Sequence, residues 1–152
     1  MQSIDETPLL KLERVLQEQG VVAGLRLLNG RAPHRFTGIY RFSPTILVNV
    51  FLVDAFVPET ERGNDVALED AYCVLLADRR QISFREPEGS PCTILGTSPV
   101  VSYCGVLLVR ANGEPYGSLC HFDLKRCQRP LTEMPFLELA APKFMAALEA
   151  RE

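Results

Sequence analysis

The 152-residue sequence lacks the segments that mark membrane and secreted proteins. No apolar run approaches the roughly 18 residues that a membrane-spanning helix needs. Met1 is followed by polar and acidic residues, whereas a secretory leader has a basic region and then an apolar core. These absences predict a cytoplasmic protein without a membrane partner.

Features that bind nucleic acids or metal ions are also scarce. The net charge is -3 and the pI is about 5.5, whereas a nucleic-acid surface requires a basic stripe. The five cysteines include no C-x-x-C pair, and there are only two histidines. We therefore expect reduced and mostly buried thiols, no metal site and no nucleic-acid partner.

What is present is typical of one globular domain. Hydrophobic residues make up 47% of the chain and charged residues 23%, both within the ordinary range. A chain of this length buries enough surface for one independent core. We expect a single domain over residues 1–152.

Residues 100–123 contain the strongest structural signal, two apolar and β-rich runs on either side of Asn112-Gly113. An Asn-Gly pair between such runs is typical of a two-residue hairpin loop. Counting outward from this loop places Val109 opposite Tyr116 and Cys104 opposite His121. Side chains alternate along a strand, so the hairpin divides into two sets. One set is Cys104, Val106, Leu108, Leu119 and His121, and the other is Tyr103, Leu107, Val109, Tyr116, Cys120 and Phe122. Both sets are largely apolar, which predicts a central hairpin covered on both faces.

Apolar periodicity and breakers predict the remaining elements. We expect helices at residues 7–19, 21–28 and 66–77 and from Thr132 onward, and strands at residues 37–42, 46–54 and 81–85. The predicted caps are Thr7, Asp65 and Thr132, Asn29-Gly30 is a predicted left-handed stop, and Pro142 should bend or break the last helix. That helix has an apolar stripe of Phe136, Leu139, Ala140, Phe144, Ala147 and Leu148. The order predicts an α/β domain, mixed α+β, with a central antiparallel sheet.

Two segments carry hints of function. In the strand at 46–54, Asn49 is the only polar residue on a face shared with Leu47, Phe51 and Val53, so it needs hydrogen bonds from a neighbouring loop or a bound molecule. Residues 86–99 are rich in proline and glycine, which is typical of a binding loop or lid.

Residues 1–20 are a candidate dimerisation element. A narrow apolar stripe of Leu9, Leu12 and Leu16 on the first helix, together with the apolar last helix, predicts a homodimer.

The hairpin also carries a family resemblance. The strands YCGVLL at 103–108 and YGSLCHFD at 116–123 resemble the two signature strands of GAF domains, and the likeness extends over residues 21–150. Many members have proline where this chain has Leu107. The resemblance implies an antiparallel sheet of about six strands with the terminal helices on one face. A helix and loops would roof a small-molecule pocket on the other face.

The resemblance implies a stand-alone, bacterial-type sensory domain that binds a small molecule and acts through a signalling partner. The sequence identifies no cofactor and no catalytic residue. The candidate ligand-binding residues are Asn49, Phe51, Asp70, Tyr72, Cys73, Tyr103, Cys104, His121 and Asp123. One pocket under residues 66–98 would receive either the hairpin set with Cys104 and His121 or the set with Tyr103 and Cys120.

Two other interpretations stay open. Cys104 and His121 could form a thiol–imidazole pair, as in a thiol-dependent enzyme similar to the free methionine sulfoxide reductases, or both could be core residues. A degenerate GAF fold that serves only protein contacts is the other alternative. Iron or haem, which some GAF domains bind, stays an open alternative. The motif that surrounds the tetrapyrrole in photoreceptor members is absent, and nothing in the sequence marks the phosphate site that a cyclic nucleotide would need.

Overall fold

Two hairpins, joined side by side, form the centre of the protein. The computed structural model describes residues 7–67, 81–84, 102–124 and 134–152. Its strands are β1 (Phe36–Phe42), β2 (Ile46–Asp54), β3 (Val66–Ala67), β4 (Gln81–Phe84), β5 (Ser102–Val109) and β6 (Pro115–Asp123). They form one antiparallel sheet in the order β3-β2-β1-β6-β5-β4. The predicted class and the predicted number of strands are confirmed.

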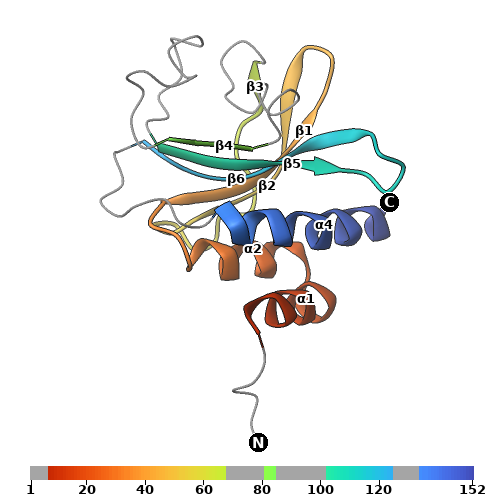
Figure 1. Ribbon diagram of the computed structural model, residues 1–152. Coiled ribbons are helices and arrows are strands. Elements are labelled where there is room, and N and C mark those ends of the chain that lie inside the picture. The colour runs from red at the N-terminus through yellow and green to blue at the C-terminus, as the bar shows by residue number, and fades with distance from the viewer. Residues whose placement is uncertain (1–6, 68–80, 85–101, 125–133) are drawn as a thin grey trace, which may run out of the picture.

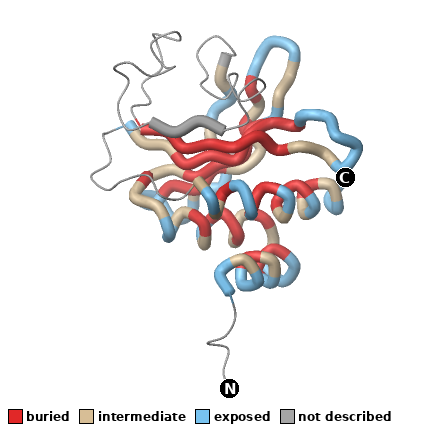
Figure 2. The backbone as a smooth tube through the Cα atoms, viewed as in Figure 1, coloured by how far each residue is buried: buried red, intermediate tan, exposed pale blue. Residues whose placement is uncertain are grey.

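The described helices all lie on one side of the sheet (Figure 1). They are α1 (Pro8–Gln19), α2 (Val21–Asn29) and α4 (Met134–Arg151). α2 and α4 pack on the sheet, and α1 packs on α2 and α4 as an outer layer (Figure 1). β5 and β6 are buried along most of their length, whereas the outward sides of the helices are exposed (Figure 2). Within the described residues, none of the helices has both the length and the apolar character required to cross a bilayer.

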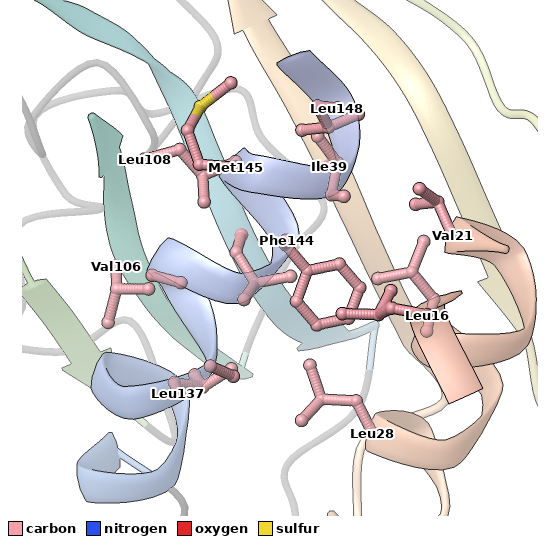
Figure 3. Close-up of a cluster of buried hydrophobic side chains, with 14 of the residues drawn as sticks. Leu16, Val21, Leu28, Ile39, Val106, Leu108, Leu137, Phe144, Met145 and Leu148 are labelled. Atoms are coloured by element: carbon pink, nitrogen blue, oxygen red, sulfur yellow. The ribbon is translucent and has the colours of Figure 1, made fainter. Parts of the chain in front are cut away.

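The core lies between the sheet and the helices. Phe144 of α4 is fully buried and points into a cluster that includes Leu16, Leu28 and Ile39 (Figure 3). Burying a side chain of this size contributes about 1.5–3 kcal/mol from the removal of apolar surface from water. Phe144 therefore contacts all three layers and holds them together.

The first two helices follow the predicted pattern with one exception. The hydroxyl of Thr7 accepts the N–H of Leu10 at 3.2 Å, which confirms the predicted cap. Gly30 is not left-handed, because its φ of -65° continues the helical turn. The left-handed residue is Gly20, with φ 97°, which lets α2 begin directly after α1.

The last helix differs from its prediction in phase. α4 continues through Pro142 without a break, and Leu139 is 56% exposed although the predicted stripe included it. The buried set is Leu137, Ala140, Ala141, Phe144, Met145 and Leu148. Apolar residues occur all round this helix, so periodicity alone could not show which side faces the sheet. The predicted cap Thr132 lies outside the described residues.

A bulge in β2 separates residues that strict alternation would place together. Ile39 pairs with Phe51 and Tyr40 pairs with Asn49, so Val50 is an extra residue. The face therefore changes at Val50. Leu47 and Asn49 point to one side, and Phe51 and Val53 point to the other, which corrects the predicted shared face.

The predicted hairpin register holds except beside the loop. Cys104 faces His121 as predicted, but Val109 faces Pro115 instead of Tyr116. The loop has three residues, since the N–H of Gly113 donates to Arg110 O and the N–H of Arg110 donates to Glu114 O. A bulge at Tyr116 then restores the predicted pairing and turns Tyr116 toward the helices.

The helix predicted at 66–77 does not begin where expected. Val66 and Ala67 form β3, which pairs with Leu47 and Ile46. Asp65, the expected cap, instead accepts the backbone N–H of Asn49 at 2.9 Å and holds this segment along β2. The remainder of that predicted helix lies outside the described residues.

The approach of β6 to β1 provides a stability test. A Cβ atom at Gly117 would overlap the backbone carbonyl of Tyr40. We expect Gly117→Ala to lower the free energy of unfolding by about 3 kcal/mol, because the two strands must separate. Urea denaturation measures this change. Gly30→Ala is the matched control, since its added Cβ meets no atom closer than 3.5 Å and its backbone is already helical. Equal effects of the two substitutions would contradict the close approach.

Candidate functional site

The sheet has two faces with different surroundings. We call the face that packs against α2 and α4 the helix face, and it carries Ile39, Cys104 and Leu119 within the core cluster. We call the opposite face the distal face. By alternation along β1, β5 and β6 it receives Gly38, Tyr40, Tyr103, Leu107, Ser118, Cys120 and Phe122.

The distal face is apolar with a few hydroxyl and thiol groups. The ring of Tyr103 lies over Gly105, where an added Cβ would be 2.5 Å from the Tyr103 hydroxyl. Cys120 Sγ donates to the carbonyl of Gly38 at 3.8 Å, and Phe36 stacks on Phe122 with ring centroids 5.0 Å apart. The predicted roof of this face, and with it Asp70, Tyr72 and Cys73, lies outside the described residues.

Asn49 finds its hydrogen bonds within the chain. Its Oδ1 accepts the N–H of Gly63 at 2.7 Å, and its Nδ2 donates to Phe51 O at 3.2 Å. The buried amide is therefore satisfied by the neighbouring loop and not by a bound molecule, which was one of the two predicted alternatives. Phe51 lies on the helix face, with Arg151 4.9 Å from its ring centroid. The side chains of Asn49 and Phe51 therefore point to opposite faces of the sheet, although both residues line one open pocket.

Cys104 and His121 are directly opposite each other, but both are on the helix face and fully buried. Nδ1 of His121 lies 2.6 Å from the hydroxyl of Thr37, which in turn accepts Nδ2 of Asn29 at 2.9 Å. The imidazole is thus oriented by a hydroxyl rather than by the thiol. This geometry favours the core interpretation of Cys104 over an activated thiolate.

His34 is a member of this cluster that the sequence did not reveal. It stacks on His121 with ring centroids 5.6 Å apart and an interplanar angle of 11°. Its side chain is 2% exposed, and within the described part of the chain neither of its ring nitrogens has a hydrogen-bond partner. Nε2 of His121 likewise has no hydrogen-bond partner among the described residues. Each such group costs roughly 1–3 kcal/mol relative to a paired one.

Burial keeps both imidazoles neutral. It lowers the pKa of His34 to about 4, although Asp123 acts in the opposite direction. It lowers the pKa of His121 to about 3, and His34 and Arg31 add to this shift. Asp123 Oδ2 accepts the backbone N–H of Arg35 at 3.0 Å, so Asp123 belongs to this helix-face cluster rather than to the distal face.

The described residues offer no cluster of three or more histidine, cysteine or acidic side chains that could share a metal ion. The two stacked histidines are only two ligands, and a zinc site needs three or four. The helix-face cluster is therefore a buried polar element of the core.

Of the nine predicted ligand residues, the structure places Tyr103 and Asn49 on the distal face. Phe51, Cys104, His121 and Asp123 lie on the helix face. A single distal pocket would therefore receive the set with Tyr103 and Cys120. Tyr40 and Ser118 join that face through the pairing of β1 with β6, which no local pattern in the sequence signals.

No protein-family model and no curated protein matches this chain in sequence. Solved structures do match it in fold. The GAF domain of an Acinetobacter phosphoenolpyruvate-protein phosphotransferase superposes with a TM-score of 0.74 at 10% identity, covering 99% of this chain and 96% of the other.

Two further structures cover nearly the whole chain. One is a protein in a far-red absorbing dark state with bound biliverdin IXa, at TM-score 0.73 and 14% identity, covering 95% and 98% of the two chains. The other is the free methionine-R-sulfoxide reductase of Neisseria meningitidis, at TM-score 0.68 and 19% identity, covering 93% and 86%.

These similarities define the class as a mixed α+β domain with terminal helices on one face of a six-stranded antiparallel sheet. The chain has the GAF fold. The predicted resemblance is confirmed at the level of the fold.

The neutral histidine pair predicts a loss of stability in mild acid. Between pH 6.5 and about 4 the unfolded chain binds protons that the folded chain does not, so stability falls as the pH falls. We expect a loss approaching roughly 1.4 kcal/mol per pH unit for each histidine. Urea denaturation at several pH values measures this slope.

His34→Gln and His121→Gln should each remove about half of the slope, whatever their effect at pH 8. Asp54 provides an internal comparison. Its pKa is held below the ordinary value by hydrogen bonds from Arg35 at 2.7 and 2.8 Å, so its contribution is lost only in stronger acid. A slope between pH 6 and 4.5 that neither substitution changes would contradict the prediction.

Proposed function

We propose that this chain is a sensory or regulatory domain that binds a small organic molecule on the distal face. Binding would be passed on to a signalling protein partner. The observation that carries the proposal is the chemical difference between the two faces of the sheet. The helix face is filled by the side chains of α2 and α4, whereas the buried distal face combines the ring of Tyr103 with the hydroxyl of Ser118 and the thiol of Cys120.

The composition of the distal face indicates the class of ligand. Leu107, Phe122 and the aromatic rings of Tyr40 and Tyr103 provide an apolar surface, and Gly38 and Gly105 add no side chains to it. No charged residue projects from the described parts of β1, β5 and β6 on this face. Such a surface suits an uncharged organic ligand better than a phosphate. The biliverdin-bound neighbour supports the idea that this fold can hold an organic molecule.

A homodimer remains part of the proposal, but with different residues at its interface. Leu12 and Leu16, which the sequence suggested for an interface, are buried against α2 and α4 within one chain. The exposed leucines of α1 and α4 are Leu10 and Leu139, at 53% and 56%. A dimer formed through these helices would use those residues.

Native mass spectrometry of protein purified without denaturation tests the proposal. We expect a bound organic molecule, and Tyr103→Phe should weaken its affinity about fivefold through the loss of one hydrogen bond. Calorimetric titration with the identified molecule measures the change. Tyr116→Phe is the matched control, because Tyr116 is turned to the helix side. Binding that depends on Tyr116 but not on Tyr103 would place the ligand elsewhere, and a ligand-free protein with no stabilising metabolite would favour a pure interaction module.

A thiol-dependent reductase is the second candidate, because Cys120 lies on the distal face and the fold is shared with a methionine sulfoxide reductase. Cys104 is on the opposite face, so of these two cysteines only Cys120 can reach a distal ligand. This candidate predicts that Cys120→Ser abolishes reduction of free methionine sulfoxide, whereas Cys104→Ser retains it. A thiol-coupled assay measures the turnover. Absence of turnover in the unmodified protein would remove this candidate.

A further inference from the structure

Three arginines from separate parts of the chain meet at one open pocket beyond the C-terminal end of α4. The pocket has a volume of about 350 Å³. Its rim includes Arg41 of β1, Arg62 of the segment after β2 and Arg151 of α4, and its apolar floor includes Val48, Phe51 and Tyr116. No carboxylate is among its lining residues in the described part of the chain. The pocket therefore combines an apolar floor with a positive rim.

The sheet is irregular at this place on both sides of β1. β2 has its bulge at Val50, and β6 has its bulge at Tyr116. Arg41 lies between them and pairs with Gly117, whose missing side chain lets the two strands approach closely. Bulges redirect side chains and are common beside functional sites. Here they bring Phe51 and Tyr116 to the floor below Arg41.

Two of the three guanidinium groups are held in position. Arg151 stacks on Phe51 with 4.9 Å between its guanidinium carbon and the ring centroid, and Arg62 Nη2 donates to Asn49 O at 3.1 Å. A guanidinium that stacks on a ring uses its flat face, which leaves the N–H groups along its edge for an acceptor. The arginines are thus partly ordered before any ligand binds, which lowers the entropy cost of binding.

The carboxylates around the pocket have partners of their own. Glu149 and Glu152 pair with Arg110, which stacks on the Tyr116 ring, at 3.7 and 3.2 Å, and Asp65 accepts the backbone N–H of Asn49. Among the described residues, no ion pair joins a carboxylate to Arg41, Arg62 or Arg151. Three guanidinium groups without an ion-pair partner among the described residues therefore line one pocket, which attracts anions locally.

We propose that this pocket binds a small organic anion, a carboxylate or phosphate carried on an apolar body. The guanidinium edges would hold the anionic group in paired hydrogen bonds, and Val48, Phe51 and Tyr116 would contact the body. The volume falls within the range of small-molecule sites. Arg41 and Phe51 belong to the helix-face set, and Asn49 is the one lining residue that the distal face shares with this pocket. Tyr103 and Cys120 do not line it, so either proposal can fail alone.

Phenyl phosphate is a suitable probe, titrated into the ¹⁵N-labelled full chain and followed by ¹H–¹⁵N NMR. We expect saturable shifts at the side-chain Nε–H groups of Arg41, Arg62 and Arg151. Phenol and inorganic phosphate, the two halves of the probe, should each bind at least about tenfold more weakly, since each lacks one set of contacts. If inorganic phosphate bound as tightly as phenyl phosphate, the apolar floor would contribute nothing to binding, and the proposal would be overturned.

Variants then test the named residues. Arg41→Gln and Arg62→Gln should each raise the Kd about five- to tenfold, because each removes charge-assisted hydrogen bonds. Arg14→Gln is the matched control, an exposed arginine of α1 beside Glu18, and should leave the Kd unchanged. The ¹H–¹⁵N spectrum of each variant confirms that it is folded.

Three further results would overturn the proposal. The first is the absence of saturable shifts, and the second is an effect of Arg14→Gln on the Kd equal to the effects of Arg41→Gln and Arg62→Gln. The third is an acidic peptide, hexaglutamate, that binds the same arginines at least about tenfold more tightly than phenyl phosphate, which would make the site a docking point for an acidic protein segment.

Discussion

The antiparallel pairing of β1 with β6 is the interaction on which the rest of the structure depends. It joins residues about 80 positions apart and connects the hairpin β1–β2 to the hairpin β5–β6 in one sheet. The pairing is close because Gly117 carries no side chain toward the backbone of Tyr40. It creates the two faces, brings Thr37 and His34 to His121, and places Arg41 between two bulges.

The two faces of the sheet differ in what covers them and in their chemistry. On the helix face, Phe144 and its neighbours fill the core, and burial keeps the stacked histidines neutral, with ring nitrogens that have no hydrogen-bond partner among the described residues. On the distal face, Gly105 leaves room for the ring of Tyr103 to lie flat. Each signature strand thus has a glycine with a physical role. Gly105 of β5 leaves room for the Tyr103 ring, and Gly117 of β6 lets that strand approach β1. Leu107, in place of the proline of many GAF domains, keeps its place in the ladder opposite Ser118.

Much of the candidate site could not be read from the sequence, because two bulges change which side chains meet. The bulge at Val50 moves Phe51 away from Asn49, and the bulge at Tyr116 moves that tyrosine to the helix side. A bulge costs one unpaired residue and leaves no composition signal, so strict alternation fails beyond it. The partner of His121 was likewise hidden, since Thr37 lies 84 residues away and only the sheet brings them together.

The sequence by itself determined the local elements and the family of folds. Thr7, Gly113 and the alternating runs of the hairpin act within a few residues, so their caps, turn and strands follow from nearby chemistry. Only the tertiary structure decided which side of each strand or helix a residue faces. It showed that Cys104 and His121 face the helices, that Leu137 rather than Leu139 is buried, and that three distant arginines share one pocket. Long-range pairing and packing select among arrangements that local propensity leaves equal, which is the physical reason for this division.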